Sequence, residues 1–270
     1  MTQSERRLYL ITELKKENPQ YAELPVPSDT AEQKHLLRAL FNVRMPKAAS
    51  DEFLKIQDEY LREETRLKGV TDISAFTPIQ PDIYLWQGDI TTLKCDAIVN
   101  AANNQMLGCF CPNHGCIDNA IHTYAGVQLR VDCAELMKKQ GHEEQTGQAK
   151  ITPAHNLPCR FVIHTVGPIV YGRLTDKDCE LLRSCYCSCL RVADKNGLKS
   201  IAFCCISTGE FHFPNERAAE IAIDTVKKYK AASRCALLCR RRCYRCRRRT
   251  FGCGRLRLRR RALSKILCRF

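Results

Sequence analysis

Three thiols and one imidazole lie within eight consecutive residues near the middle of the chain. The stretch reads Cys109, Phe110, Cys111, Pro112, Asn113, His114, Gly115 and Cys116. Thiolate sulfur and imidazole nitrogen are ligands that zinc takes in proteins, and the glycine and proline favour a loop in which these side chains can converge. Because the stretch follows a predicted strand end rich in side-chain amides, at residues 99–104, it predicts a catalytic site.

Two other loops carry groups suited to a nucleotide. In the first, Gly88 allows a sharp turn, and the Asp89 carboxylate can accept from an exocyclic amine or cap a following turn. The second, Ser207 to Pro214, can direct backbone N–H groups at a phosphate or serve as an ordinary strand-to-helix connection. The amides of Asn100 and Asn103 can likewise bond sugar hydroxyls or loop backbone. None of these loops identifies a ligand by itself.

Short apolar runs rich in β-branched residues predict the strands that position these loops. They cover residues 83–86, 97–99, 161–166 and 200–206. Helical patterns alternate with them, at 117–140, 176–196 and 215–230. This alternation predicts an α/β fold with a largely parallel sheet covered on both faces. Ligands of such sheets bind beyond the carboxyl ends of the strands, where the polar loops should meet.

The first 75 residues predict a small helical unit that precedes the sheet. Apolar residues recur at helical spacing over 4–18, over 30–42 and from about 49 to 69, and Ser50 can cap the third helix. No constellation of reactive side chains occurs in this unit. We therefore expect a helical extension over 1–75 and a main domain over 80–230.

The basic character of the chain is confined to its C-terminal segment. A formal net charge of +14 would ordinarily suggest a nucleic-acid or membrane partner. However, residues 1–233 hold 28 basic and 29 acidic residues, and the other 15 basic residues lie in 234–270 with no acidic ones. That segment mixes Arg, Cys and Leu without an apolar period. We expect 231–270 to be a non-native or disordered tail, and we expect no nucleic-acid partner.

Cysteine usage and hydropathy bear on the compartment. Outside the tail, 12 cysteines occur in tight groups such as 185, 187 and 189, which suits buried thiols in a reducing compartment. No apolar run reaches the roughly 18 residues of a membrane span, and the first residues lack the apolar core of a signal peptide. We expect a cytoplasmic protein that does not associate with membranes.

Taken together, the motifs resemble those of the macrodomain, a module that binds ADP-ribose. Gly88-Asp89-Ile90 is similar to its adenine-side loop, Asn100 to Asn103 to its ribose-side motif, and Ser207 to Pro214 to its diphosphate loop. Residues 116–126 and 162–168 add further similarity, so the resemblance covers about 80–230. It implies a macrodomain-type three-layer α/β/α sandwich with a mixed, largely parallel sheet.

The cysteine-rich loop replaces the glycine-rich stretch of ordinary hydrolytic macrodomains. It is similar to that of the zinc-dependent, sirtuin-linked bacterial subclass, which also carries a helical N-terminal extension. The resemblance implies that Cys109, His114 and Cys116 bind Zn²⁺. Reasoning from the residues alone leaves Cys111 as an alternative to Cys109, although the adjacent proline limits its backbone. Three protein ligands leave a fourth position open, as in catalytic zinc sites.

By this resemblance, the chain is a hydrolase that removes mono-ADP-ribose from modified protein side chains, by cleaving a glycosidic or ester bond. Asn103 and Asp118 would be the catalytic residues. Asn103 would hold the distal ribose, and Asp118 would act as general base or orient a water, with capping of the following helix as its alternative role. The family also implies a sirtuin-like ADP-ribosyltransferase and a lipoyl-carrier protein as functional partners.

The expected contacts with ADP-ribose are spread over the three loops. They are Asp89, Ile90, Asn103, Ser207, Thr208, Gly209, Glu210, Phe211 and Phe213, with Phe213 packing on the proximal ribose or adenine. His122, His155 and His164 are expected to be structural. The alternative function is a non-catalytic ADP-ribose-binding module with a structural zinc. Because macrodomains of this type end in a further strand that the tail does not resemble, we also expect a sheet without that strand and a less stable fold.

Overall fold

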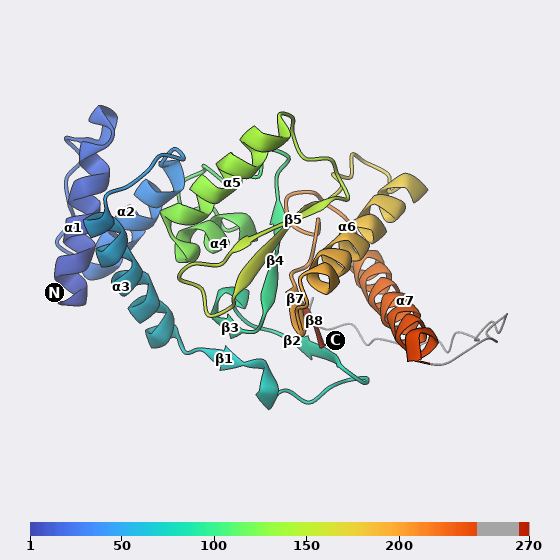
Figure 1. Ribbon diagram of the computed structural model, residues 1–270. Helices are drawn as coiled ribbons and strands as arrows, with labels where there is room; N and C mark the ends of the chain where they lie inside the picture. The colour runs from blue at the N-terminus through green and yellow to red at the C-terminus, as the bar shows by residue number, and fades with distance from the viewer. Residues whose placement is uncertain (242–264, 270) are drawn as a thin grey trace.

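The computed structural model describes residues 1–241 and 265–269 (Figure 1). It begins with a bundle of α1 (Gln3–Lys16), η1 (Pro19–Tyr21), α2 (Thr30–Val43) and α3 (Asp51–Lys68). Each α-helix starts at a side-chain cap, and Ser50 accepts from the Phe53 N–H at the start of α3 as expected. Apolar faces of these helices form a core of their own, which Val127 joins from the main domain.

A mixed six-stranded sheet follows, with strand order β2-β8-β7-β4-β6-β5. Its strands are β2 (Ile83–Trp86), β4 (Ala97–Ala102), β5 (Ala149–Pro153), β6 (Phe161–Val166), β7 (Ser200–Phe203) and β8 (Lys265–Arg269). Strand β4 pairs in parallel with both β6 and β7, whereas β5, β2 and β8 pair antiparallel. The sheet is therefore parallel at its centre, where the strands are buried on both faces, and antiparallel outside it.

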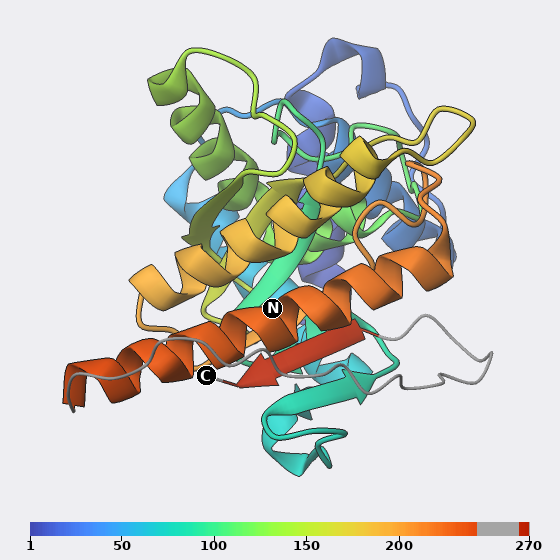
Figure 2. The same cartoon turned by 90° about the vertical axis from the view of Figure 1, so that its right-hand side faces the viewer.

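Helices cover both faces of the sheet, so the predicted three-layer sandwich is confirmed (Figure 1). One face carries α4 (Ile117–Ala125) and α5 (Val127–Gln140), and the N-terminal bundle lies beyond them. The other face carries α6 (Asp176–Lys195) and α7 (Asn215–Arg241), which run across the sheet in Figure 2. The sheet and these helices share one large apolar core.

Smaller elements connect the bundle to the sheet. They are β1 (Thr71–Asp72), η2 (Ile73–Ala75), η3 (Ile90–Thr92) and β3 (Leu93–Lys94), and β1 pairs in parallel with β3. None of the helices in the described residues is long and apolar enough to cross a membrane.

Two local features differ from the sequence-based expectations. The single helix expected over 117–140 is broken at Gly126, whose φ of 96° few other residues adopt. Strand β5 was not predicted, because only one of its residues, Thr152, is fully buried and its apolar pattern is weak.

The expectation of a sheet without its final strand was wrong. Residues Lys265–Arg269 form β8, which pairs antiparallel with β2 on one side and β7 on the other. Backbone hydrogen bonds to two neighbours define this strand, and the side-chain pattern of a five-residue segment does not reveal them. Helix α7 also continues past residue 230 to Arg241. Residues 242–264 and 270 of the expected tail lie outside the described residues.

Candidate active site and metal centre

The predicted loops meet at one edge of the sheet. Because β4 and β7 pair in parallel, the loops that follow them, 103–116 and 204–214, leave the sheet at the same edge. The two loops touch where His114 Nε2 lies 3.5 Å from the Glu210 carboxylate. The structure thus brings the cysteine-rich loop beside the predicted phosphate loop.

Three of the four candidate ligands in the cysteine-rich loop converge. Ligand atoms of Cys109, His114 and Cys116 all lie within 4.8 Å of one another, and each residue is half-buried. Cys109 Sγ lies 3.7 Å from His114 Nδ1. Cys111 is exposed and does not belong to this cluster. The geometry therefore favours Cys109 over Cys111 as the first thiol of the site.

Local backbone geometry shapes the loop around these ligands. Gly108 has φ of 80°, and a Cβ there would lie 2.7 Å from the His122 ring, so the chain can pass this point only as glycine. Asn113 adopts a left-handed φ of 55° just before His114. Cys116 then caps α4, its Sγ accepting from the Asn119 N–H at 3.4 Å.

Burial is the main reason why a free thiolate is unfavourable at Cys116. Burial raises the pKa of this thiol to about 12, the hydrogen bond from Asn119 opposes that rise, and the adjacent Cys109 thiol adds to it. A coordinated metal ion deprotonates its thiol ligands outright. The Cys116 thiol is thus suited to binding a cation rather than to acting as an unaided nucleophile.

Asn103 organises the start of the same loop. Its Nδ2 donates to the Gly108 carbonyl at 3.1 Å, and its Oδ1 accepts from the Gln105 N–H at 3.1 Å. An amide has two N–H groups and an oxygen with two lone pairs, so one donor and one acceptor position remain. The contact of Asn103 with a sugar stays a prediction.

Asp118 lies in the first turn of α4 and is 5% exposed. Asn100 Nδ2 donates to its Oδ1 at 2.7 Å, and His122 Nε2 is 3.6 Å from the same oxygen. Burial raises the pKa of Asp118 to about 6, while the Asn100 hydrogen bond and the Arg130 charge act against that rise. The carboxylate is therefore held in a fixed position two residues after the candidate ligand Cys116.

The three histidines expected to be structural are placed differently. His155 pairs with Asp132 at 2.7 Å on the surface. His164 is fully buried and His122 is 5% exposed. Together with Cys133, His122 and His164 bring their ligand atoms within 4.8 Å of one another.

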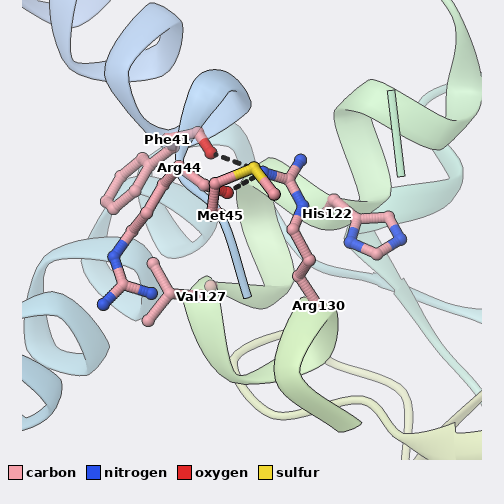
Figure 3. A pocket seen from close by; sticks show the side chains of 7 residues that line it. Phe41, Arg44, Met45, His122, Val127 and Arg130 are labelled. Carbon is pink, nitrogen blue, oxygen red and sulfur yellow. Dashed lines mark hydrogen bonds between the residues drawn. The ribbon is translucent and has the colours of Figure 1, made fainter. Parts of the chain in front are cut away.

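A small cavity borders His122 (Figure 3). It has a volume of about 10 Å³, lined by Phe41, Arg44, Met45, His122, Gly126, Val127 and Arg130. This is about the space that one water molecule needs. Arg130 lines this cavity and donates to the carbonyls of Phe41 and Arg44 (Figure 3).

At the other end of the edge, Asp89 follows β2 and caps η3. Its Oδ1 accepts from Thr91 N–H at 2.9 Å and Oγ1 at 2.7 Å, and its Oδ2 lies 3.3 Å from Lys68 Nζ. Burial raises the pKa of Asp89, but the Thr91 and Lys68 interactions outweigh it and the pKa is lowered. Ile90 is fully buried, and its side chain packs in the main apolar core.

The loop after β7 presents free amides. Among the described residues, the N–H groups of Gly209, Glu210 and Phe211 have no backbone or side-chain acceptor. Ser207 is held at φ of 64°, with its carbonyl accepting from the Phe213 N–H at 2.9 Å. Consecutive unpaired amides in such a turn form an anion-binding concavity.

The expected contact of Phe213 with a sugar or base is not supported. Phe213 is 1% exposed and belongs to the main apolar core. Its ring therefore fixes the loop to the core, because exposing the ring to water would lose the favourable free energy of its burial. Thr208 also turns inward, its Oγ1 donating to the Cys205 carbonyl at 3.0 Å.

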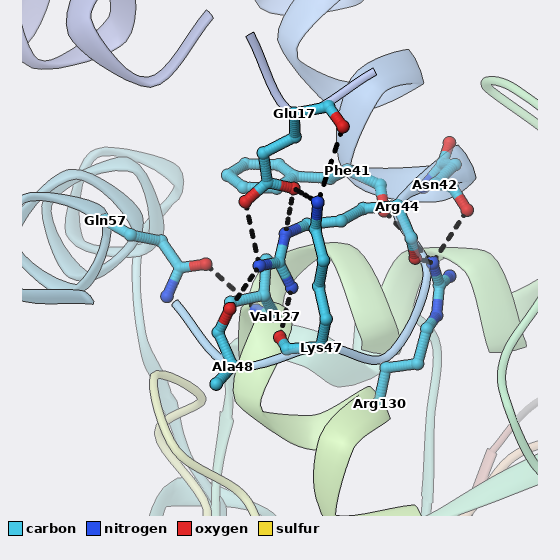
Figure 4. A network of polar contacts seen from close by, with 9 residues as sticks. All are labelled: Glu17, Phe41, Asn42, Arg44, Lys47, Ala48, Gln57, Val127 and Arg130. Carbon is cyan, nitrogen blue, oxygen red and sulfur yellow. Dashed lines mark hydrogen bonds and ion pairs between the residues drawn. The ribbon is translucent and has the colours of Figure 1, made fainter. Parts of the chain in front are cut away.

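Sequence reasoning missed residues that support the cysteine-rich loop from elements far away in the sequence. Arg38 of α2 donates to the His114 carbonyl at 2.9 Å and to Asn119 Oδ1 at 2.8 Å. Arg130 of α5 donates to the carbonyls at the end of α2, in the network of Figure 4. An arginine on an amphipathic helix reads as a solvated charge, so no local signal in the sequence could have identified either one.

Comparison with known proteins agrees with this geometry. A family model described as Macro domain matches residues 99–222, which include both the cysteine-rich loop and the free amides. A Treponema medium protein named protein-ADP-ribose hydrolase is 59% identical over 241 residues, 88% of this chain and 92% of that protein. One of the same name from Staphylococcus aureus (strain MRSA252) is 51% identical over 223 residues, 82% of this chain and 84% of that protein.

Solved structures show the same fold. The Trypanosoma brucei macrodomain in complex with ADP-ribose is 34% identical, with a TM-score of 0.53, over 71% of this chain and 82% of that one. Its complex with ADP gives a TM-score of 0.54, over 71% of this chain and 84% of that one.

Proposed function

This chain belongs to the macro domain family, and we propose that it is a zinc-dependent hydrolase that removes mono-ADP-ribose from modified protein side chains. The observation that carries the proposal is the convergence of Cys109, His114 and Cys116 immediately before the buried Asp118. The free amides of the neighbouring loop and the names of the curated relatives support it.

The donor set fits zinc. Cys109 Sγ and His114 Nδ1 are 3.7 Å apart, close to the separation of about 3.6 Å expected for sulfur and nitrogen bound to one tetrahedral zinc. The Glu210 carboxylate beside His114 Nε2 is the kind of partner that orients a ligating imidazole. Zinc held by three protein groups would bind a ribose hydroxyl in its open position, orient the sugar, and polarise the bond or activate a water.

Residues of the chain would complete the chemistry. Asp118 would act as general base or orient the attacking water, and Asn100 would keep its carboxylate in place through the 2.7 Å hydrogen bond. Asn103 would hold the distal ribose with its remaining donor and acceptor positions. Because Asn103 also bonds the Gly108 carbonyl, it would couple the sugar to the cysteine-rich loop.

The rest of ADP-ribose would lie along the same edge of the sheet. Asp89 would accept from the adenine amine, with the Ile90 backbone beside it, and Lys68 would be displaced from the carboxylate or share it. The diphosphate would bind the free amides of Gly209, Glu210 and Phe211. Ser207 and Thr208 would shape this turn rather than contact the ligand with their side chains.

The substrate would be a mono-ADP-ribosylated protein. The two further partners, a sirtuin-like ADP-ribosyltransferase that attaches the group and a lipoyl-carrier protein that bears it, rest on the family resemblance alone. Both are tested by the release of ADP-ribose from a lipoyl-carrier protein modified by such a transferase.

Three single cysteine variants test the metal site. Zinc content and release of ADP-ribose from a modified protein are measured for the intact chain and for Cys109→Ala, Cys116→Ala and Cys111→Ala. We expect Cys109→Ala and Cys116→Ala to lose zinc and to lower the rate by more than about 100-fold, since a ligand matters more than its outer-shell partners. Cys111→Ala, whose thiol lies outside the cluster, should retain both.

The outcomes separate the competing functions. Hydrolysis that survives removal of the metal by a chelator would exclude the zinc mechanism. Binding of ADP-ribose without release from any modified protein would favour a binding module with a structural zinc.

A further inference from the structure

We propose that Arg38 is a positioning residue of the metal site, through which the N-terminal helical bundle holds the cysteine-rich loop in its metal-binding shape. The inference deepens the proposed function and rests on it, because it requires that the loop binds zinc. It assigns a role to the helical extension, in which the sequence shows no reactive constellation.

One guanidinium contacts both the cysteine-rich loop and the first turn of α4. Arg38 Nη2 donates to the His114 carbonyl at 2.9 Å and to Asn119 Oδ1 at 2.8 Å, and its Nε donates to the same Oδ1 at 3.2 Å. His114 and Asn119 lie on either side of the ligand Cys116. The planar fork of an arginine can make such paired contacts, which a lysine cannot reproduce.

Asn119 passes this restraint on to the rest of the loop. It is fully buried, and its Nδ2 donates to the Cys111 carbonyl at 3.0 Å. Its backbone N–H donates to Cys116 Sγ at 3.4 Å. Through Asn119, Arg38 therefore restrains both the middle of the loop and the thiol at its end.

A second residue of α2 supports the same loop one turn later. Asn42, on the same helix face as Arg38, accepts from the Asn113 N–H at 2.9 Å and donates to Thr123 Oγ1 at 3.0 Å. Asn113 is the residue with the left-handed φ of 55°. This uncommon conformation is therefore held by α2 directly before His114.

The end of α2 is itself fixed to the main domain. Arg130 donates to the carbonyls of Phe41, Asn42 and Arg44, which the helix leaves without partners at its C-terminus (Figure 4). Burial lowers the pKa of Arg130 to about 10, so it stays charged at neutral pH. The helix that carries Arg38 is thus a rigid support.

A preformed ligand loop binds its metal more tightly than a loose one. Without Arg38, the loop between Gly108 and α4 would have to order itself on binding, and the lost conformational freedom would reduce the affinity. Outer-shell partners of metal ligands commonly contribute 10–100-fold in affinity. The expected effect is therefore on metal affinity and ligand geometry.

The test compares metal binding by the unaltered full chain with that of three variants. The zinc dissociation constant is measured by competition with a chromogenic chelator, and the absorption spectrum of the cobalt(II) form reports ligand geometry. We expect Arg38→Ala to weaken zinc binding by about 10–100-fold and to change the cobalt spectrum. Arg38→Lys, which keeps the charge but not the fork, should weaken it by at least about threefold.

Arg6→Ala is the matched control. Arg6 links α1 to Glu59 of α3 at 2.8 Å within the same bundle but touches no part of the loop. Arg6→Ala should leave the zinc dissociation constant and the cobalt(II) spectrum unchanged, even if the substitution lowers the melting temperature. Unchanged affinity and spectrum in both Arg38 variants, or an equal loss in Arg6→Ala, would overturn the inference while leaving the proposed function intact. An unaltered chain that binds no zinc would instead overturn the proposed function, and this inference with it.

Discussion

His164 illustrates how burial sets the charge of a residue next to the site. Its ring is fully buried, and burial lowers its pKa to about 3, so it is neutral at pH 7. Asn100 lies 3.2 Å from its Nδ1 and Thr152 Oγ1 lies 2.9 Å from its Nε2. If Asn100 Nδ2 donates to Nδ1, the proton is on Nε2. His164 thus orients the amide that holds Asp118.

This neutral ring predicts a loss of stability in acid. The unfolded chain binds a proton at His164 below about pH 6.5, whereas the folded protein does not until about pH 3. The free energy of unfolding should therefore fall by about 1.4 kcal/mol per pH unit below 6.5 from this group. Urea unfolding of the chain and of His164→Gln, measured between pH 7 and pH 5, checks this.

The quantity to compare is the difference in free energy of unfolding between the unaltered chain and His164→Gln at each pH. Asp118, whose pKa is raised, acts in the opposite direction between about pH 4 and 6, and His122, whose pKa is lowered, acts in the same direction as His164. Both contributions largely cancel in the comparison. His164→Gln should show the shallower decline, and parallel pH curves would contradict the assignment.

At the residue scale, sequence reasoning located the candidate ligands that share one loop and missed contacts between residues that are far apart in the sequence. Cys109, His114 and Cys116 share one loop, and their residue types indicate metal binding before any fold is known. Arg38 acts across 76 residues on His114, and its contact exists only once α2 has packed against the loop. The burial of Phe213 is also a property of the folded core, since an aromatic side chain beside a polar turn reads equally well as a stacking surface.

At the scale of elements, the break between α4 and α5 positions the bundle. Gly126 has φ of 96°, and a Cβ there would lie 2.7 Å from both Gln57 Nε2 and Gln128 Oε1. These two side chains hydrogen-bond each other at 2.8 Å, across the contact between α3 and α5. The glycine therefore lets the bundle approach the main domain closely.

A pair of glycine variants tests this reading. Gly126→Ala should lower the free energy of unfolding by about 3 kcal/mol, since it combines backbone strain with a steric clash. Gly141→Ala, at the end of α5 with φ of 77° and no atom within 4 Å of its Cβ, should lose only about 1 kcal/mol. Chemical denaturation of the two variants measures their free energies of unfolding. Equal losses would show that the close approach of Gly126 to Gln57 does not contribute to the cost of the alanine side chain.

Most elements follow from periodicity, and the exceptions have physical reasons. Helical spacing predicted α1, α2, α3 and α6, and compact apolar runs predicted the central strands β4, β6 and β7. Strand β5 is mostly half-buried, so its alternation is weak. The break at Gly126 has no signature beyond one glycine, which a continuous helix also tolerates.

At the scale of the whole molecule, two cores meet through polar contacts. Within the part of the chain that the structure describes, the bundle core includes only Val127 from the main domain. Around it, Arg130 donates to the Asn42 carbonyl at 2.8 Å and Gln57 accepts from the Val127 N–H at 2.9 Å (Figure 4). Directional hydrogen bonds of this kind fix an orientation that apolar packing alone leaves loose. The two units therefore have a defined orientation, in which α2 contacts the cysteine-rich loop through Arg38 and Asn42.

The last strand of the sheet links the C-terminal segment to the stability of the whole fold. Among the described residues, β2 joins the sheet through β8 alone, and β8 also covers the edge of β7. A chain ending at Arg241 should lose both ladders and melt at least about 5 °C lower, as a loss of 2 kcal/mol or so implies for a protein of this size.

The proposed zinc binding and hydrolysis should persist in the same truncated chain below the melting transition, because the cysteine-rich loop and the loop after β7 both precede β8. The comparison therefore separates the sheet from the site. An unchanged melting temperature would mean that Lys265–Arg269 contribute no stability. A loss of zinc at low temperature would mean that the cysteine-rich loop depends on β8. The candidate site is held by α2, α4 and β4, which this truncation leaves in place. We therefore expect the melting temperature to fall and the zinc content to stay unchanged.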